Sequence, residues 1–358
     1  MSKRRYILKV AAAAGLASMM VGAQPALAAP AGYNDTVDRV RTVGSDTTYF
    51  ANQKLANLYN SSPGCSLTES SGFTQCLAAT PPGPPVENYD HDEVTDAFPV
   101  GSGAGIKQVC GAPSGTLGAD IARSSRDKSS SDCAGLTFRA FAKDAIVPII
   151  FPSIGASPGS AGVTTLSRTQ LQGIFVNCTI TDWGQVGGVT GQRIIPFGTQ
   201  SNSGTYASFK TYLGSDPNNC PNTTQPDVTN RVIFENNARP IADKGADVQG
   251  DSIYFMSVGR FNSAPFTRAD GVFTSVEGTK PTSSNISDGT YPISRNLFNV
   301  HKTTASQATL AYVDWFCRTD HGSDPETGRN FDAEITSAIA STGFLRLSTC
   351  PTPPSSNT

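Results

Sequence analysis

The sequence lacks several patterns that would assign a common chemistry. Its 358 residues include three scattered histidines, and none of its eight cysteines belongs to a Cys-x-x-Cys pair, so we expect no metal cofactor. No Gly-x-x-x-x-Gly-Lys-Ser/Thr loop occurs, and residues 101–105 do not continue as Gly-x-Gly-x-x-Gly. No apolar run is long enough to span a membrane. These absences argue against a zinc protein, a nucleotide-cofactor enzyme and membrane insertion.

Residues 1–28 have the pattern of a signal peptide. A basic head is followed by an apolar run over residues 10–21 and by Ala26-Leu27-Ala28, which resembles a cleavage site. Arg4-Arg5 leaves a twin-arginine signal as an alternative to the general export route. No cysteine stands directly at the cleavage point, so we expect a secreted protein without a lipid anchor.

The charge balance is acidic. The expected leader holds four of the 27 basic residues and none of the 29 acidic ones, so the remaining chain has a net charge of −6. This excess argues against nucleic acid as a partner. An anionic ligand would have to be held by local dipoles and hydrogen bonds, because the overall field opposes it.

Eight cysteines in an exported chain predict four disulfides. The spacing leaves the connectivity open, and we favour sequential pairing because each bond then closes a local loop. The expected pairs are Cys65–Cys76, Cys110–Cys133, Cys178–Cys220 and Cys317–Cys350.

Length and periodicity predict an α/β protein of two lobes. About 330 mature residues exceed one ordinary core, and strand-like and helix-like segments alternate. Residues 145–151 are almost continuously apolar, as in a buried strand, although Pro148 favours an edge position or a break there. Ser167 can cap a helix whose apolar face carries Leu171, Ile174 and Phe175.

Three turns rich in Gly, Ser and Thr run directly into helical patterns. They occupy residues 44–48, 101–105 and 201–205. A helix N-terminus presents free N–H groups and a partial positive charge, and hydroxyls add donors. If the fold brings these ends together, they form a site for a small oxyanion. Each turn by itself is better explained as an ordinary helix cap.

Two further segments carry weaker signals. Residues 120–126 end in Ser124-Ser125 between Arg123 and Arg126, which either places Ser125 and one arginine on an anion or forms a solvated strand end. Residues 90–93 are an acidic loop that could alternatively hold a cation. In Gly155-Ala156-Ser157-Pro158-Gly159, the proline lacks the N–H that a serine-hydrolase oxyanion hole requires.

Taken in order, these segments resemble the periplasmic phosphate-binding proteins that feed ABC phosphate importers. The match continues through residues 166–175, 180–184, 200–205, 291–295 and 343–345. The resemblance implies a two-lobed α/β fold of the periplasmic-binding-protein type with hinge crossover strands. The lobes would be residues 29–147 with 298–358, and residues 148–297. It also implies a monomer that binds inorganic phosphate or a similar oxyanion between the lobes, with an ABC transporter permease as partner.

The family's binding residues carry over to positions in the three turns, and the pattern of the arginine-flanked serines adds Ser125 and an arginine. The expected site is Thr48, the Tyr49 backbone, Ser102, Ser125, Arg126, Ser203, Gly204 and Thr205. Two positions depart from the family pattern, because Ser125 stands where an aspartate is common and Thr199 where an arginine is common. Arg123 or Arg126 could supply the missing charge, and Asp46 the missing proton acceptor.

Two other functions fit parts of this pattern. An extracellular phosphate-ester hydrolase could use the same anion cradle, provided that a nucleophile and a base lie within hydrogen-bond reach. A surface module with a vestigial site is the third possibility. We expect a binding protein without enzymatic activity or cofactor.

Overall fold

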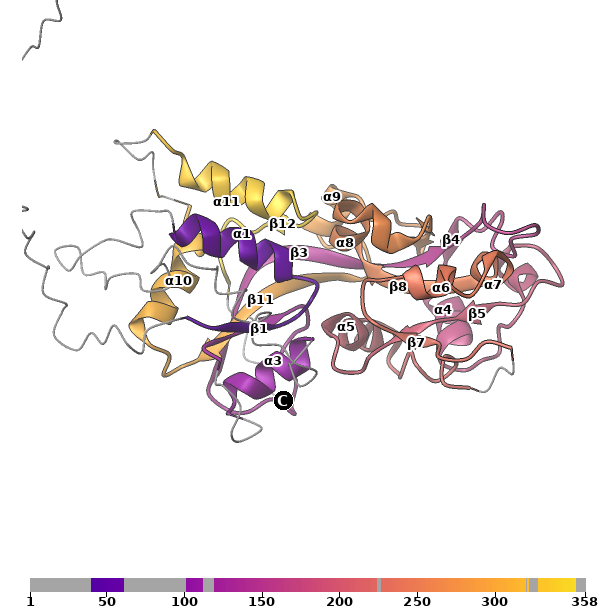
Figure 1. Ribbon diagram of the computed structural model, residues 1–358, viewed down its shortest axis with the longest axis horizontal. Coiled ribbons are helices and arrows are strands. Elements are labelled where there is room, and N and C mark those ends of the chain that lie inside the picture. The colour runs from indigo at the N-terminus through magenta and orange to yellow at the C-terminus, as the bar shows by residue number, and fades with distance from the viewer. Residues whose placement is uncertain are drawn as a thin grey trace, which may run out of the picture.

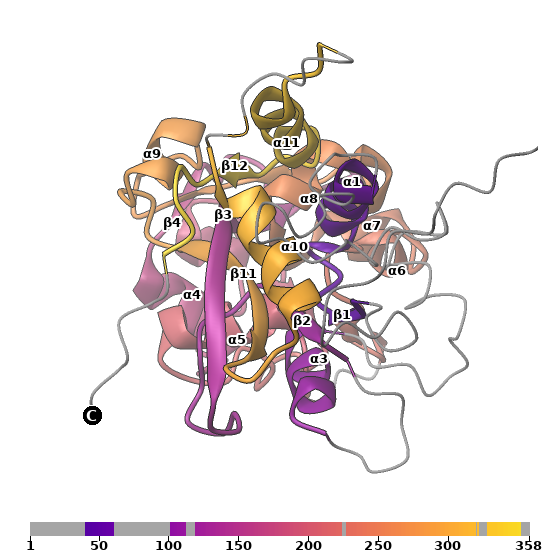
Figure 2. The same cartoon turned by 90° about the vertical axis from the view of Figure 1, so that its left-hand side faces the viewer.

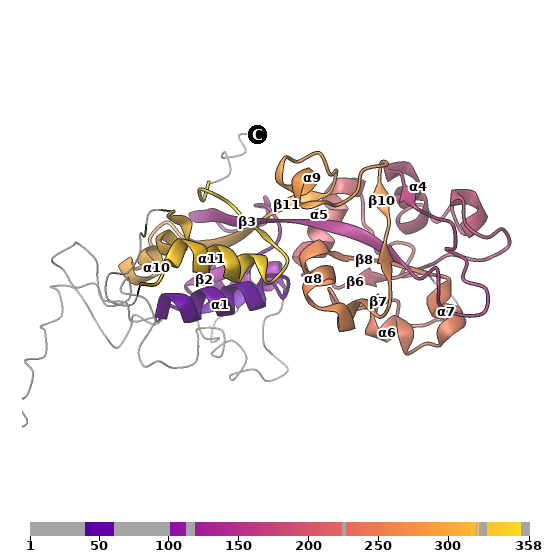
Figure 3. The same ribbon diagram turned by 90° about the horizontal axis from the view of Figure 1, so that it is seen from above.

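The computed structural model describes residues 40–60, 101–111, 119–223, 227–319, 321 and 328–351. The expected signal peptide, the Cys65–Cys76 pair and the acidic segment 90–93 lie outside these residues. The described chain forms two lobes joined by extended strands (Figures 1 and 3). The first lobe carries α1, α3, α10 and α11, and the second carries α4 to α9.

The helices alternate with short strands along most of the chain. The helices are α1 Tyr49–Asn60, α3 Ser102–Val109, α4 Arg168–Phe175, α5 Gly204–Leu213, α6 Arg239–Ala242, α7 Ala246–Gly250, α8 Val258–Ser263, α9 Ser283–Ser287, α10 Gln307–Cys317 and α11 Phe331–Ala340, with the 3₁₀ turns η4 Trp183–Val186 and η5 Pro265–Arg268. None of these described helices has the length and apolar character needed to cross a bilayer.

The strands build one large sheet and two small ones. They are β1 Thr42–Gly44, β2 Ile121–Ser124, β3 Leu136–Ile150, β4 Thr165–Leu166, β5 Ile195–Pro196, β6 Gly198–Thr199, β7 Val232–Ile233, β8 Ser252–Ser257, β9 Val272–Phe273, β10 Ser275–Val276, β11 Ser294–Lys302 and β12 Leu345–Arg346. The large sheet has the order β1-β2-β11-β3-β8-β5, with β9 and β12 also pairing with β3. The small sheets pair β4 with β10 and β6 with β7.

Strand β3 passes from one lobe into the other. Its first part pairs antiparallel with β11, up to the partners Ala145 and Ser294, and its last residues pair with β8 and β9. Figure 3 shows β3 running across the junction between the lobes. The strand and the entry into β11 are therefore the crossover connections of the two-lobed fold.

The expectation that Pro148 marks an edge or a break is wrong. Pro148 lies inside β3, a central strand, opposite Phe255 of β8. On the other side of β3, Ile146 donates its N–H to Ile293 and Pro148 accepts the N–H of Thr274. Because backbone groups two residues apart point the same way, the missing N–H of Pro148 faces the gap between β11 and β9. No bond to β8 is lost.

The hydrophobic residues separate into clusters on either side of the lobe junction. One cluster runs from Ala145 to Ile293 and fills the second lobe. In the first lobe, neighbouring β11 residues face opposite ways, so Leu297 packs with α1, α10 and α11, and Phe298 packs with α3. The sheet of this lobe is consequently covered on both faces (Figure 2).

The helix capped by Ser167 forms as predicted. The Ser167 hydroxyl accepts the N–H of Gln170, and the Gln170 side chain accepts the N–H of Ser167, which is a complete capping box. Leu171, Ile174 and Phe175 are buried. This helix packs onto the second lobe through the apolar face that the sequence indicated.

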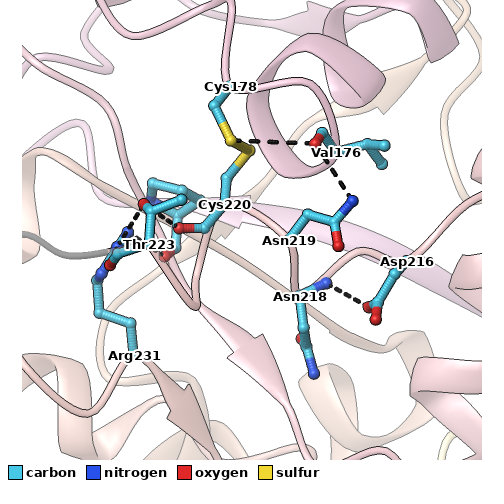
Figure 4. The surroundings of a disulfide bond; sticks show 9 residues. Val176, Cys178, Asp216, Asn218, Asn219, Cys220, Thr223 and Arg231 are labelled. Carbon is cyan, nitrogen blue, oxygen red and sulfur yellow. Dashed lines mark hydrogen bonds between the residues drawn. A yellow bond between two sulfur atoms is a disulfide. The ribbon is translucent and has the colours of Figure 1, made fainter.

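Three of the four predicted disulfides lie within the described residues, and all three are confirmed. They are Cys110–Cys133, Cys178–Cys220 and Cys317–Cys350. Figure 4 shows the second one, which ties the segment after α4 to the segment before β7. The Cys220 N–H also donates to the carbonyl of Phe175 at 3.0 Å, so the bond reinforces an existing contact.

Replacing both Cys178 and Cys220 by alanine should lower the free energy of unfolding by roughly 2–4 kcal/mol, because the bond closes a long loop. Their sequence separation is 42 residues. Urea denaturation with a folded, monomeric variant measures the loss. The chemically reduced wild-type protein, with all bridges open, should lose at least as much. An unchanged midpoint in the variant would contradict this assignment of the bond.

Candidate anion-binding site

The starts of α1, α3 and α5 meet at the junction of the lobes. The Gly101 N–H donates to the carbonyl of Gly44 at 3.0 Å, which joins the turns before α3 and α1. The Gly103 N–H donates to the carbonyl of Asn202 at 3.1 Å, which joins α3 to the turn before α5. Three helix N-termini that are far apart in sequence therefore converge, as the anion hypothesis requires.

Glycine permits this close approach at Gly105. A Cβ placed on Gly105 would lie 2.6 Å from the Cα of Gly44. Any side chain there would separate α3 from the turn that leads into α1.

Six hydroxyl side chains gather at this point, and we call them the hydroxyl cluster. They are Ser45, Thr47, Ser102, Ser125, Ser203 and Thr205, and none is more than 1% exposed. The Ser125 hydroxyl lies 2.9 Å from that of Ser45 and 3.3 Å from that of Ser102. Across the junction, the Thr47 hydroxyl lies 3.3 Å from that of Thr205. The cluster thus combines donors from both lobes in a site closed to solvent.

Two buried arginines border the cluster. Arg295 donates to the carbonyl of Ser125 at 3.0 Å and to the Thr205 hydroxyl at 3.3 Å, and it pairs with buried Asp144 at 2.8 Å. Arg123 is 2% exposed, donates to the Thr42 carbonyl at 3.2 Å, and lies over the Tyr49 ring. Arg295 joins the crossover strand β11 to both sides of the site.

Two carboxyl groups also face the cluster. The Ser203 hydroxyl donates to Glu235 Oε2 at 2.6 Å, and the Thr47 hydroxyl lies 3.4 Å from the same oxygen. Within the described ranges, no donor lies within hydrogen-bond distance of the buried oxygens Glu235 Oε1 and Asp46 Oδ2. Burial, and then the charge of Glu235, raise the pKa of Asp46 to about 7. A proton bound between these carboxyls would give both free oxygens a partner.

The structure brings five of the predicted site residues together. Ser102, Ser125, Ser203 and Thr205 belong to the hydroxyl cluster, and Gly204 packs against it. The remaining three lie at its margin or away from it.

The other predicted residues have different contacts. The Thr48 hydroxyl bonds to the Ser45 carbonyl at 3.4 Å, within its own turn. The Tyr49 N–H donates to the carbonyl of Asp46 at 3.3 Å. Arg126 binds both carboxylate oxygens of Asp132, at 2.9 and 2.6 Å, so its guanidinium points away from the cluster. Of the two arginines offered as substitutes for the missing charge, Arg123 is the one beside the site.

Sequence reasoning omitted four residues that the structure places here. Ser45 and Thr47 lie in the first predicted turn, so their residue type was available as a signal. Arg295 ends the matched segment 291–295. Glu235 follows the short strand β7 and has no local pattern that marks it.

Replacing Gly204 by alanine should destabilise the closed arrangement by about 1–3 kcal/mol, because the site has no room for a methyl group. A Cβ there would lie 2.3 Å from the hydroxyls of Ser102 and Ser125. Urea denaturation measures the effect. Gly103→Ala is the matched control, since its Cβ would have nothing closer than 3.4 Å. Equal stability of the two variants would contradict this packing.

The raised pKa of Asp46 predicts a pH-dependent stability. The folded protein holds this proton more tightly than the unfolded chain, so the contribution is complete below the ordinary pKa and is lost as pH rises through about 7. Urea denaturation between pH 5 and pH 8 in phosphate-free buffer should show a smaller decline for Asp46→Asn than for the wild type. Asp243→Asn, at an exposed position, should keep the full decline. Parallel curves for all three proteins would refute the assignment.

Comparison with known proteins agrees with this architecture. A family model described as a PBP superfamily domain matches residues 29–320. The fold is similar to that of an ABC-type phosphate transport receptor from Vibrio cholerae, with 22% identity, a TM-score of 0.52, and coverage of 86% of this chain and 99% of that chain.

A second solved structure shows the same fold. It is assigned as a phosphate ABC transporter substrate-binding protein with bound phosphate from Clostridium perfringens. Its identity is 17% and its TM-score 0.55, with coverage of 86% of this chain and 99% of that chain. No curated protein sequence matches the chain. Because the family model covers most of the sequence, the chain belongs to the PBP (periplasmic-binding-protein) superfamily.

Proposed function

We propose that this chain is a secreted solute-binding protein that captures inorganic phosphate between its lobes. The observation that carries the proposal is the hydroxyl cluster, in which donors from three helix starts converge on one buried point. Helix N-termini and hydroxyls bind a tetrahedral oxyanion without needing a net positive charge. This suits a chain whose overall charge is negative. The phosphate receptors with similar folds bind a ligand of the same kind.

The two carboxyl groups favour phosphate over sulfate. Hydrogen phosphate carries a proton that it can donate to a carboxylate, whereas sulfate at neutral pH carries none and would face a buried acceptor unpaired. Ser125 stands where the family often has an aspartate. Asp46 and Glu235 supply free carboxyl oxygens at the same cluster instead. We therefore assign the proton-acceptor role to this pair.

The lobe boundaries proposed from the sequence are residues 29–147 with 298–358, and residues 148–297. The buried clusters support crossovers close to these bounds, although Ala145 already packs in the second-lobe cluster and Leu297 packs in a first-lobe cluster. Closure would bring Ser203 and Thr205 against Ser102 and Ser125, as in a hinge motion around β3 and β11. A monomer that delivers phosphate to an ABC transporter permease is the corresponding biological role.

The hydrolase alternative has less support. Hydrolysis of an ester needs a nucleophile beside a base that can accept its proton. Among the described residues, the histidines are His301, bonded to the Lys302 carbonyl, and His321, bonded to Asp332. Neither contacts the hydroxyl cluster. The Ser203 hydroxyl does lie beside a carboxylate, Glu235, but it is also the N-cap of α5 and accepts the Tyr206 N–H, which gives it a structural role.

Parallel calorimetric titrations with phosphate and sulfate test the proposal. Phosphate should bind more tightly than sulfate. Ser203→Ala should weaken phosphate binding by about 1–3 kcal/mol, because a buried donor is removed. Ser263→Ala is the matched control, since among the described residues that hydroxyl bonds within its own helix, to the Gly259 carbonyl. If neither phosphate nor sulfate produces binding heat, the proposal is refuted.

A further inference from the structure

A large groove lies beside the hydroxyl cluster. Its volume is about 1140 Å³. One wall is formed by α3 and residues 126–133, and the other by residues 201–214 and 292–295. Pockets of a few hundred to 1000 Å³ accommodate organic ligands of considerable size. The groove therefore has far more room than one tetrahedral anion occupies.

The groove is rich in positive charge. Its lining includes five cationic side chains and two carboxylates, namely Lys107, Arg126, Lys128, Lys210, Arg295, Asp127 and Asp132. The arginines are balanced, because Arg126 pairs with Asp132 and Arg295 pairs with Asp144. The three lysines are exposed and form no ion pair within the described parts of the chain. This concentration stands out on a chain with a net charge of −2.

The three lysines come from three separate elements. Lys107 lies on α3, Lys128 in the loop after β2, and Lys210 on α5. One exposed lysine contributes little to binding a single anion, because water screens it. Several lysines on opposite walls can act together only on a ligand that carries several charges.

The groove continues to the hydroxyl cluster. Ser203 and Arg295 border both. Lys210 follows Ser203 by seven residues along α5, a rise of roughly 10 Å at 1.5 Å per residue. Lys210 therefore extends the positive charge along the α5 side of the groove, beyond the cluster. An elongated anion matches this distribution better than a compact one.

We propose that the groove binds a linear chain of phosphoryl groups. Each phosphoryl group would add a negative charge within reach of a lysine, and the groove walls would exclude part of the surrounding water. A short condensed phosphate and the triphosphate of a nucleotide present the same chemistry. This activity goes beyond orthophosphate capture, because its recognising lysines lie outside the hydroxyl cluster.

Titration calorimetry with sodium tripolyphosphate, ATP and orthophosphate tests the groove. The variant is Lys128→Glu/Lys210→Glu, which reverses one charge on each wall. The matched control is Lys280→Glu/Lys302→Glu, which makes the same charge change at exposed positions away from the groove. We expect the groove variant to bind tripolyphosphate at least tenfold more weakly than the wild type, with orthophosphate changed less than threefold. For the control variant, the dissociation constants of tripolyphosphate and of orthophosphate should each change less than threefold.

The outcomes separate this inference from the proposed function. If the wild type does not bind tripolyphosphate, or if the groove variant binds it as the wild type does, the groove inference is overturned. The inference is also overturned if the control variant loses as much affinity for tripolyphosphate as the groove variant does. If the groove variant loses affinity for ATP and for tripolyphosphate together, the groove recognises a phosphoryl chain whatever it is attached to. If the wild type binds tripolyphosphate and not ATP, the ligand is the bare condensed phosphate. Failure of orthophosphate to bind refutes the proposed function and leaves the groove result standing.

Discussion

The structure depends on the desolvation of polar groups at the junction of the lobes. Burying hydroxyls, helix starts and carboxyls costs free energy unless each finds a partner. The partners here come from the opposite lobe, as when Gly103 bonds to Asn202 and Thr47 lies against Thr205. These polar groups find their partners only when the lobes are together. The same contacts therefore hold the lobes together and shape the site.

The charged groups around the cluster follow the same logic. Arg295 is buried together with Asp144, and this pair sits on the crossover strands β11 and β3 that join the lobes. Because both partners are buried, the pair fixes the guanidinium in position without adding net charge. Asp46 and Glu235 leave the free acceptors. The site therefore combines fixed donors with a pair of carboxyl groups that can accept a proton from hydrogen phosphate.

Local sequence patterns predicted the features that depend on neighbouring residues. Ser167 capped α4 as expected, the three described disulfides followed sequential pairing, and the Gly/Ser/Thr turns each led into a helix. Pro148 was misjudged because its missing N–H had to be compared with the register of β11 and β9. That register is set by strands about 125 to 150 residues further along the chain.

The sequence by itself determined the helix starts, the residue types available to bind an anion, and the division into two lobes. These follow from capping, hydrophobic periodicity and chain length, which act over short distances or over the whole composition. Only the tertiary structure decided that Arg295 and Glu235 join the cluster. A side chain's partner across a lobe junction depends on how two separately folded surfaces meet. No local sequence pattern encodes which residues then come into contact.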